Sequence, residues 1–189
     1  MTVEPVQHTH PLLDHRGPWS EADYLALPEV EGTRIDLVDG DLVLSPSPDN
    51  AHQRLVALLL FELHRQVPDG YEALPGGNVR LASGRINIPD VLVVTLADRI
   101  VNDAADVPLV AEIVSDSGRF RDRILKPVLY AEAGIPWYIR VEPRPRVELV
   151  LHRLEKGRYV EQGRAHEGQR VEIPELGITI EVDALVPRR

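Results

Sequence analysis

The sequence contains no cysteine, which excludes disulfide bonds, thiolate zinc sites and cysteine nucleophiles together. Aromatic residues are sparse, at 5%, so a hydrophobic core must consist mainly of leucine, valine and isoleucine. No run approaches the ~18 consecutive apolar residues of a membrane span, since the longest candidate, residues 55–63, already contains Glu62. The first ten residues have neither a basic region nor an apolar run. We therefore expect no signal peptide, no membrane contact and a cytoplasmic location.

Basic residues are also fewer than acidic ones. The chain has 30 acidic and 21 basic residues and a formal net charge of −9. Proteins that bind nucleic acid without sequence preference are usually basic, because neutralising phosphates drives their affinity. The charge therefore counts against a nucleic-acid partner. There is also no GxGxxG motif and no Walker-type loop, so a nucleotide cofactor is not implied.

What is present is an ordinary globular composition. The 189 residues are 43% hydrophobic and 27% charged, which suits one domain with a sizeable core. Residues 1–17 show no periodicity and are interpreted as a flexible leader. Residues 18–186 are interpreted as a single domain.

Local signals predict the order of elements. Ser20 and Asp23 indicate a capped helix start, and Asp39-Gly40 lies between two alternating runs, which is typical of a hairpin over 34–45. Asp49 or Asn50 is expected to cap a helix that runs to about residue 67, and another helix is expected from 119 to 132, ended by Gly134. Strands are expected over 71–74, 78–82, 88–96, 109–115, 136–141, 147–154, 159–164 and 178–182. This order predicts a mixed α/β domain with a central sheet.

Two acidic residues interrupt apolar strands in this pattern. Asp90 lies within INIPDVLVV and Glu112 within PLVAEIV. A buried carboxylate is costly unless it is paired or binds a metal. Each acid could point outward from a half-exposed strand. Because consecutive strands are often neighbours, the two carboxylates could instead converge, and hard oxygen ligands of this kind suit Mg²⁺.

A predicted helix follows the strand that carries Glu112. Asp122, Lys126 and Tyr130 are spaced four residues apart and therefore lie near one face of that helix. Lys126 could reach back over the strand ends, where its amine would orient a water or neutralise charge on a phosphoryl group. Alternatively, Asp122 and Lys126 form an ordinary surface ion pair.

Four segments together resemble the restriction endonuclease family of the Uma type, within the PD-(D/E)XK nuclease superfamily. The resemblance covers about residues 20–182. It is carried by RIDLVDGDLVLSPSPDNAH at 34–52, IPDVLVV at 88–94, LVAEIVSDS at 109–117 and, most distinctively, RDRILKPVLYAEAGIPWYIRVE at 121–142.

The resemblance implies a restriction-endonuclease-like core, that is, a mixed central β-sheet flanked by helices. It also implies an endodeoxyribonuclease that uses Mg²⁺ or Mn²⁺ to hydrolyse phosphodiester bonds, most naturally in DNA. Asp90 and Glu112 match the motif acids, and Asp36 matches a position where the family commonly has a glutamate, which makes these three the expected metal ligands. His52 matches a recurrent histidine at the start of the following helix and is an expected catalytic residue, which would contact a phosphate or carry a proton. Lys126 is the expected catalytic lysine. The superfamily lysine normally stands two residues after the second acid, where this chain has Val114.

Two alternatives to a nuclease remain open on the residues alone. One is a catalytically inactive nuclease fold that serves as a binding or regulatory module, and the other is a structural role in which the acids pair with arginines. His52, taken alone, could also be a helix-cap or solvent-exposed residue. A homodimer is expected if both strands of a duplex are cut, because that needs two sites.

The metal-site hypothesis carries an expectation about stability. Two carboxylates that share a site without a cation repel each other. Asp90→Ala should then leave folding intact or raise the stability of the metal-free protein. If Asp90 pairs with an arginine instead, the same change should destabilise the protein.

Overall fold

The computed structural model describes residues 12, 15–46, 48–115 and 121–186. Most of the predicted leader lies outside these residues. In its described part, Leu12 packs against an apolar cluster that includes Tyr24, and the ring of His15 stacks on Trp19 with 3.7 Å between centroids. No helix in the described ranges is long and apolar enough to cross a membrane.

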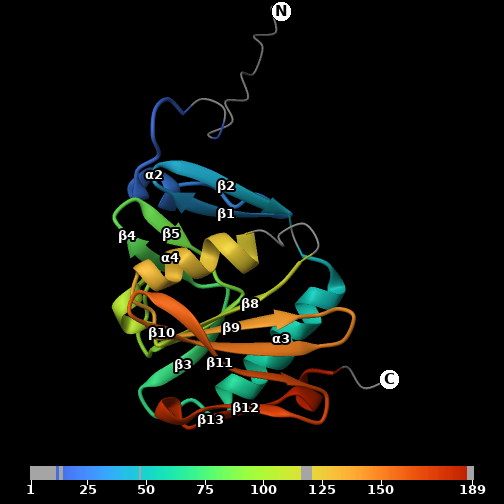
Figure 1. Ribbon diagram of the computed structural model, residues 1–189. Coiled ribbons are helices and arrows are strands. Elements are labelled where there is room, and N and C mark those ends of the chain that lie inside the picture. The colour runs from blue at the N-terminus through green and yellow to red at the C-terminus, as the bar shows by residue number, and fades with distance from the viewer. Residues whose placement is uncertain (1–11, 13–14, 47, 116–120, 187–189) are drawn as a thin grey trace, which may run out of the picture.

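A six-stranded sheet forms the centre of the molecule (Figure 1). Its order is β11-β10-β9-β8-β6-β3, with β8 and β9 parallel and all other neighbours antiparallel. The parallel pair requires a crossover, which a helical segment supplies: a π-helical turn, η2, over Arg121–Leu125 and then α4 over Lys126–Glu132. The strands are β3 (Tyr71–Pro75), β6 (Val91–Thr95), β8 (Leu109–Ile113), β9 (Trp137–Glu142), β10 (Glu148–Glu155) and β11 (Arg158–His166).

A second, five-stranded sheet has the order β2-β1-β5-β4-β7. Its β1–β2 hairpin turns at Asp39 and Gly40, which both have positive φ, 54° and 88°. This is the turn that Asp-Gly favours, because glycine adopts positive φ without strain. The strands are β1 (Thr33–Val38), β2 (Asp41–Pro46), β4 (Asn78–Ala82), β5 (Arg85–Asn87) and β7 (Val101–Asp103). The short helix α2 (Glu21–Leu25) precedes them, with the predicted capping box between Ser20 and Asp23.

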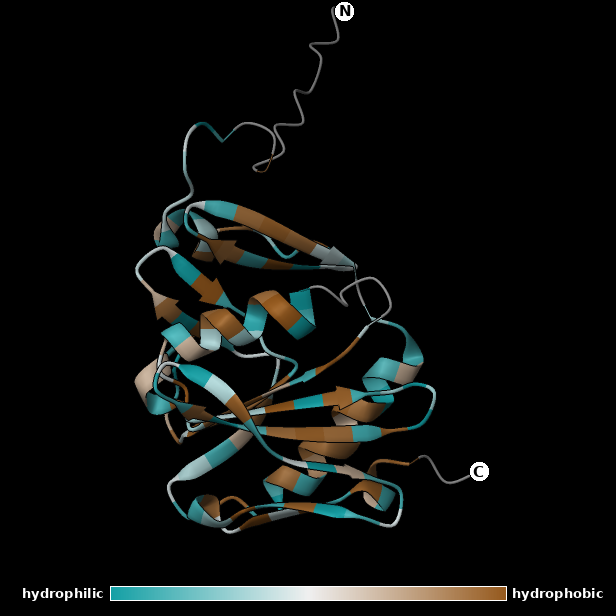
Figure 2. Cartoon of the chain, in the orientation of Figure 1, coloured by the Kyte–Doolittle hydropathy of each residue, from teal (hydrophilic) through white to brown (hydrophobic). Residues whose placement is uncertain are grey.

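The two faces of the central sheet are covered differently. Helix α3 (Asn50–His64) lies against one face, together with the small sheet of β12 (Arg170–Ile173) and β13 (Ile178–Glu181). Helix α4 and the five-stranded sheet cover the other face (Figure 1). Buried apolar residues of α3 and the central strands form one core cluster. Figure 2 shows hydrophobic residues, in brown, along these elements. Single-turn 3-10 helices occupy Ala104–Asp106, Pro174–Leu176 and Val182–Leu185.

The predicted fold class is confirmed: the chain is a mixed α/β domain with a central sheet flanked by helices. One boundary matters for the site. The strand expected over 88–96 begins only at Val91, because Pro89 has no N–H to donate to a neighbouring strand. Asp90 therefore lies at a bend just before β6. Strands β5, β7 and β12 were not predicted, and residues 119 and 120 of the expected helix lie outside the described ranges.

Candidate active site

Asp90 and Glu112 meet at the ends of two neighbouring strands. Strands β6 and β8 pair antiparallel with Val91 opposite Ala111. The same register continued by one residue sets Asp90 opposite Glu112. Both acids line one cavity of about 380 Å³. The interpretation that either acid points outward is wrong, because Asp90 is 3% exposed and Glu112 is fully buried.

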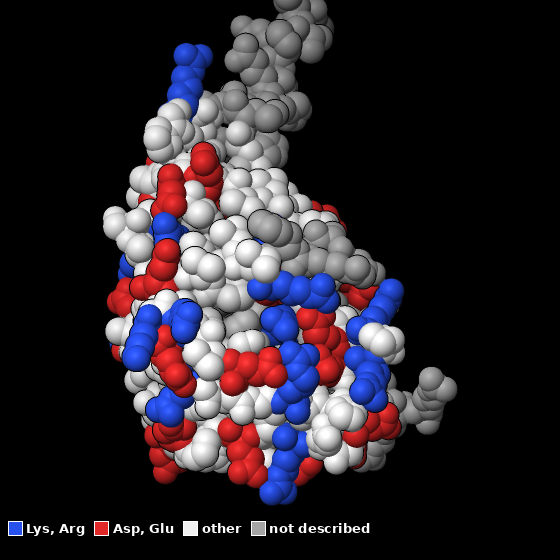
Figure 3. Space-filling model, in the orientation of Figure 1, with Lys and Arg blue, Asp and Glu red and all other residues white. Residues whose placement is uncertain are grey.

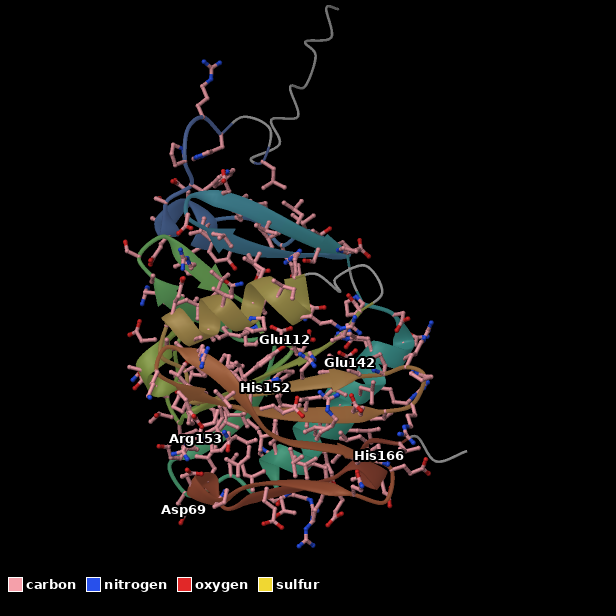
Figure 4. All side chains as sticks on the ribbon, in the orientation of Figure 1. Asp69, Glu112, Glu142, His152, Arg153 and His166 are labelled. Carbon is pink, nitrogen blue, oxygen red and sulfur yellow. The ribbon has the colours of Figure 1, made fainter. Side chains whose placement is uncertain are left out.

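Strand alternation turns Glu112 toward α4. Leu109, Ala111 and Ile113 of β8 pack on the α3 side, so Glu112 points the other way. Figure 4 shows Glu112 between α4 and the central strands. One carboxylate oxygen, Oε2, accepts a hydrogen bond from Lys126 Nζ at 2.8 Å, and Oε1 accepts one from the Tyr130 hydroxyl at 2.5 Å.

Lys126 points toward the acids, as its helical spacing with Asp122 predicted. It is 4% exposed, and its amine lies 3.7 Å from Asp122 Oδ1 in addition to its bond to Glu112. The alternative of a surface ion pair is wrong, since Asp122 is also buried, at 7% exposed. Asp122 Oδ2 accepts from the backbone N–H of Ser115. Burial raises the pKa of Asp122.

Burial and the neighbouring carboxylates shift the pKa values of Glu112 and of the groups that contact it. Burial, together with the charges of Asp90 and Asp122, raises the pKa of Glu112 to about 8 in spite of the attraction of Lys126. Burial opposes the charge on Lys126, but the surrounding carboxylates outweigh it and raise the pKa of Lys126. Burial and the charge of Glu112 also raise the pKa of the Tyr130 hydroxyl.

Asp90 is held by three donors. Its Oδ1 accepts from Arg34 Nη1 at 2.7 Å, and its Oδ2 accepts from the backbone N–H of Ile113 at 2.8 Å and from His52 Nε2 at 3.0 Å. Burial alone would raise the pKa of Asp90. The hydrogen bond from His52 and the charges of Arg34 and Lys126 outweigh burial and hold the pKa well below its ordinary value.

His52 lies inside this network rather than in solvent. Asp49 is the N-cap of α3 and its carboxylate accepts from the His52 backbone N–H at 2.8 Å, which fixes the first turn of the helix. His52 Nε2 lies 3.0 Å from both Asp90 Oδ2 and the Ile113 carbonyl oxygen. Both neighbours are acceptors, so Nε2 carries a proton and donates. Nδ1 is buried and has no hydrogen-bond partner among the described residues.

Asp36 is fully buried but does not line the cavity. Its Oδ1 accepts from the backbone N–H of Ile88, and its Oδ2 accepts from Arg121 Nη2 at 2.9 Å. The structure therefore connects Asp36 to the cavity through Arg121, which does line it.

Arg34 is a site residue that the sequence reasoning missed. It lies on the same face of β1 as Asp36, two residues away, and reaches Asp90 across 56 positions of the chain. The signal was the presence of a second charged residue in an otherwise apolar strand. Among other arginines, Arg121 lines the cavity, whereas Arg80 pairs with Glu21 and Asp103 and Arg123 pairs with Glu142, both away from it. Arg119 lies outside the described residues.

The described residues contain no group of three or more histidine, aspartate or glutamate side chains placed to hold a metal. The carboxylates that line the cavity are those of Asp49, Asp90, Glu112 and Asp122, and Ile113, whose carbonyl oxygen lies 3.0 Å from His52 Nε2, lines it as well. On the outer surface, acidic and basic side chains are interspersed and form no basic face in the view of Figure 3.

Comparisons with known proteins agree on a nuclease-type domain. Residues 21–184 match the model of the Uma2 family, described as "Putative restriction endonuclease". A solved structure, described as a putative nuclease belonging to DUF820 from Anabaena variabilis ATCC 29413, superposes with a TM-score of 0.70 at 14% identity. The superposition covers 89% of this chain and 97% of that chain, and it shows the shared fold. No curated protein matches the sequence.

Proposed function

The chain belongs to the Uma2 restriction endonuclease family, and from this premise we propose that it is a nuclease that hydrolyses phosphodiester bonds with a divalent metal ion. The observation that carries the proposal is the convergence of Asp90, Glu112 and Lys126 in one cavity from three separate elements. We propose DNA as the substrate, and a homodimer if both strands of a duplex are cut.

The donor set fits Mg²⁺. Magnesium is usually bound through one or two carboxylates and keeps several water ligands, so it does not need three protein side chains. Asp90, Glu112 and the Ile113 carbonyl supply hard oxygen atoms of this kind, and Mn²⁺ accepts the same ligands. Burial is the largest cause of the raised pKa of Glu112, and the charges of Asp90 and Asp122 add to it. Those two neighbouring charges support the proposal, because they would also attract a cation.

The role that we propose for Asp36 differs from the metal ligand that the family resemblance implied. Each of its oxygens already accepts a hydrogen bond, and its side chain lies outside the cavity lining. We assign it the role of holding Arg121 in place rather than direct contact with the first metal.

A bound Mg²⁺ would polarise the scissile phosphate and lower the pKa of a coordinated water. The side chains of the chain itself do the rest. Lys126 supplies a positive charge at 2.8 Å from Glu112, where it can stabilise the negative charge that develops on the phosphate. His52 acts as a positioning residue, because its Nε2 proton is already shared between Asp90 and the Ile113 carbonyl.

One observation favours the inactive alternative. Both acids accept hydrogen bonds from protein donors, Asp90 from three and Glu112 from two. Such a network can persist as a structural core after catalysis is lost. Metal binding separates the two possibilities, because only the nuclease requires it.

The test combines a binding readout with an activity readout. Thermal melts of wild type and Asp90→Asn are recorded with EDTA and with Mg²⁺ or Mn²⁺, and single- and double-stranded DNA are incubated with each protein. We expect the metal to raise the Tm of the wild type but not of Asp90→Asn, and cleavage only by the metal-loaded wild type. Asp103→Asn is the matched control, since Asp103 is exposed and lies away from the cavity. A wild type that neither gains stability with metal nor cleaves either form of DNA would leave the inactive module as the function.

A further inference from the structure

Two arginines at the cavity have contacts that the metal chemistry leaves unexplained. Arg34 and Arg121 come from β1 and the π-helical turn and both line the cavity. Each is fixed by a buried acid: Arg34 by Asp90, and Arg121 by Asp36. Each nevertheless keeps 25% of its side chain exposed, while the acids keep 4% and 1%. The guanidinium groups are thus anchored at one edge and open at another.

The open edge of Arg34 is defined by its hydrogen bonds. Within the described part of the chain, both of its bonds leave from Nη1, to Asp90 Oδ1 at 2.7 Å and to the Ile88 carbonyl at 3.3 Å. A guanidinium has five N–H donors in a planar fork that matches the oxygens of a phosphate. Arg121 is also anchored by Ser45 Oγ at 2.6 Å, so its orientation is fixed before any ligand arrives.

The charge of the cavity differs from that of the whole chain. Among the residues that line it, four are basic (Arg34, Arg121, Lys126, Arg144) and four are acidic (Asp49, Asp90, Glu112, Asp122). The chain as a whole has 30 acidic and 21 basic residues. The lining of the cavity is therefore balanced in charge, so an anion meets less repulsion there than the net charge of the chain would suggest.

Apolar residues share the cavity with the arginines. Leu44, Pro46, Pro48, Ala51 and Pro143 line it, and Leu44 is 51% exposed. Arginines that can bind an anion, side by side with apolar residues, suit a ligand in which a phosphate is joined to a sugar and a base. The volume of about 380 Å³ lies at the small end of ligand sites. It accommodates a nucleotide-sized stretch of a strand rather than the cross-section of a duplex.

We propose that Arg34 and Arg121 bind the phosphodiester backbone of the substrate on the approach to the acids. The proposal rests on the nuclease function and deepens it by assigning the residues that hold the substrate. The competing explanation is that both arginines only neutralise Asp90 and Asp36. A purely neutralising arginine would gain nothing from an exposed edge in a cavity, and replacing it with lysine would preserve its role.

The experiment measures binding rather than cleavage. A short fluorescein-labelled oligodeoxynucleotide, single-stranded or duplex, is titrated with protein by fluorescence anisotropy. The titrations are run in EDTA and with Ca²⁺, which takes the same oxygen ligands as Mg²⁺. The variants are Arg34→Gln and Arg121→Gln. Arg123→Gln is the matched control, since Arg123 belongs to the same helical turn as Arg121 but pairs with Glu142 outside the cavity.

Each cavity variant should bind about tenfold more weakly than wild type and lower the slope of log K against log salt by about 1. Arg123→Gln should change neither quantity. Arg34→Lys and Arg121→Lys keep the charge that Asp90 and Asp36 need but lose the fork, so they should fold, keep the slope and still bind more weakly than wild type. Melting curves establish that each variant is folded, and the lysine variants carry the test if a glutamine variant is not.

The outcomes separate this inference from the proposed function. If wild type binds and the folded cavity variants bind equally well, the arginines are neutralisers and the inference is wrong, while the nuclease proposal stands. If wild type binds neither probe under either condition, the nuclease proposal fails and the inference fails with it. Preference of the wild type for the single-stranded probe would support the nucleotide-sized site directly.

Discussion

Removing the carboxylate of Asp90 should destabilise the metal-free protein. Two converging acids alone would predict relief of repulsion and unchanged or higher stability. The structure instead places Asp90 among three donors, from Arg34, His52 and the Ile113 backbone. The pKa of Asp90 is lowered, which means that its surroundings favour the charged form over the neutral one.

The magnitude follows from what Asp90→Ala leaves behind. The change removes the carboxylate that accepts from the buried Ile113 N–H and that pairs with the partly buried charge of Arg34. Removing one member of a buried ion pair costs about 3–5 kcal/mol. For a domain of this size each kcal/mol lowers the Tm by about 2–4 °C, so the expected drop is about 6–20 °C.

The assay is urea unfolding of wild type and Asp90→Ala in EDTA at neutral pH. Asp103→Ala is the control: the Asp103 side chain is 57% exposed and pairs with Arg80, so its removal should change stability by less than about 1 kcal/mol. The depressed pKa fixes the pH dependence. The stabilisation from Asp90 is fully present above the ordinary value of 3.8 and is lost as the pH falls below it, so the variant and wild type should converge in acid. An Asp90→Ala protein as stable as wild type at neutral pH would refute this reading of the network.

Three further changes test other parts of the site. Tyr130→Phe removes the hydrogen bond to Glu112 but keeps the ring, and should cost about 1–3 kcal/mol in urea unfolding, with no loss expected if the hydroxyl bond is unimportant. Glu112 has a pKa of about 8 in the folded protein against an ordinary 4.5. Its contribution to the stability of the metal-free protein should therefore be full below pH 4.5 and decline as the pH rises toward 8. Glu112→Gln should flatten that decline. Asp49→Ala removes the N-cap of α3, and should cost about 1 kcal/mol and weaken the hold on His52, seen as a lower Tm and broadened His52 ring signals in NMR.

Features set by neighbouring residues were predictable from the sequence. The capping box of Ser20 and Asp23, and the Asp39-Gly40 turn, each depend on a few consecutive positions, and both form as expected. The same is true of α3, whose N-cap Asp49 was one of two candidates. Local hydrogen bonds of this kind do not depend on how the rest of the chain packs.

Features that depend on contacts between residues distant in the chain could not be predicted from the sequence. Strands β5 and β7 have only three residues each, too few for an alternation pattern to stand out. Strand β5 pairs with its neighbour β4 and with the distant β1, and β7 pairs with β4. The partnership of Arg34 with Asp90 joins two sheets and appears only when these meet. The sequence could place charged residues in apolar strands, but it could not say which of them are partners.

The position of Lys126 shows why a site can keep its geometry while its sequence motif changes. Strand alternation places residue 114 on the same face of β8 as Glu112, and there the chain has the buried Val114, which lines the cavity but offers no amine. Because β8 and β9 are parallel, the chain must cross back over the sheet after Val114, and it does so through α4. The first residue of α4 is Lys126, so the crossover carries its amine to 2.8 Å from Glu112. The proposed nuclease chemistry would require a positive charge at one point in space, and the crossover helix can supply it there as well as the strand can.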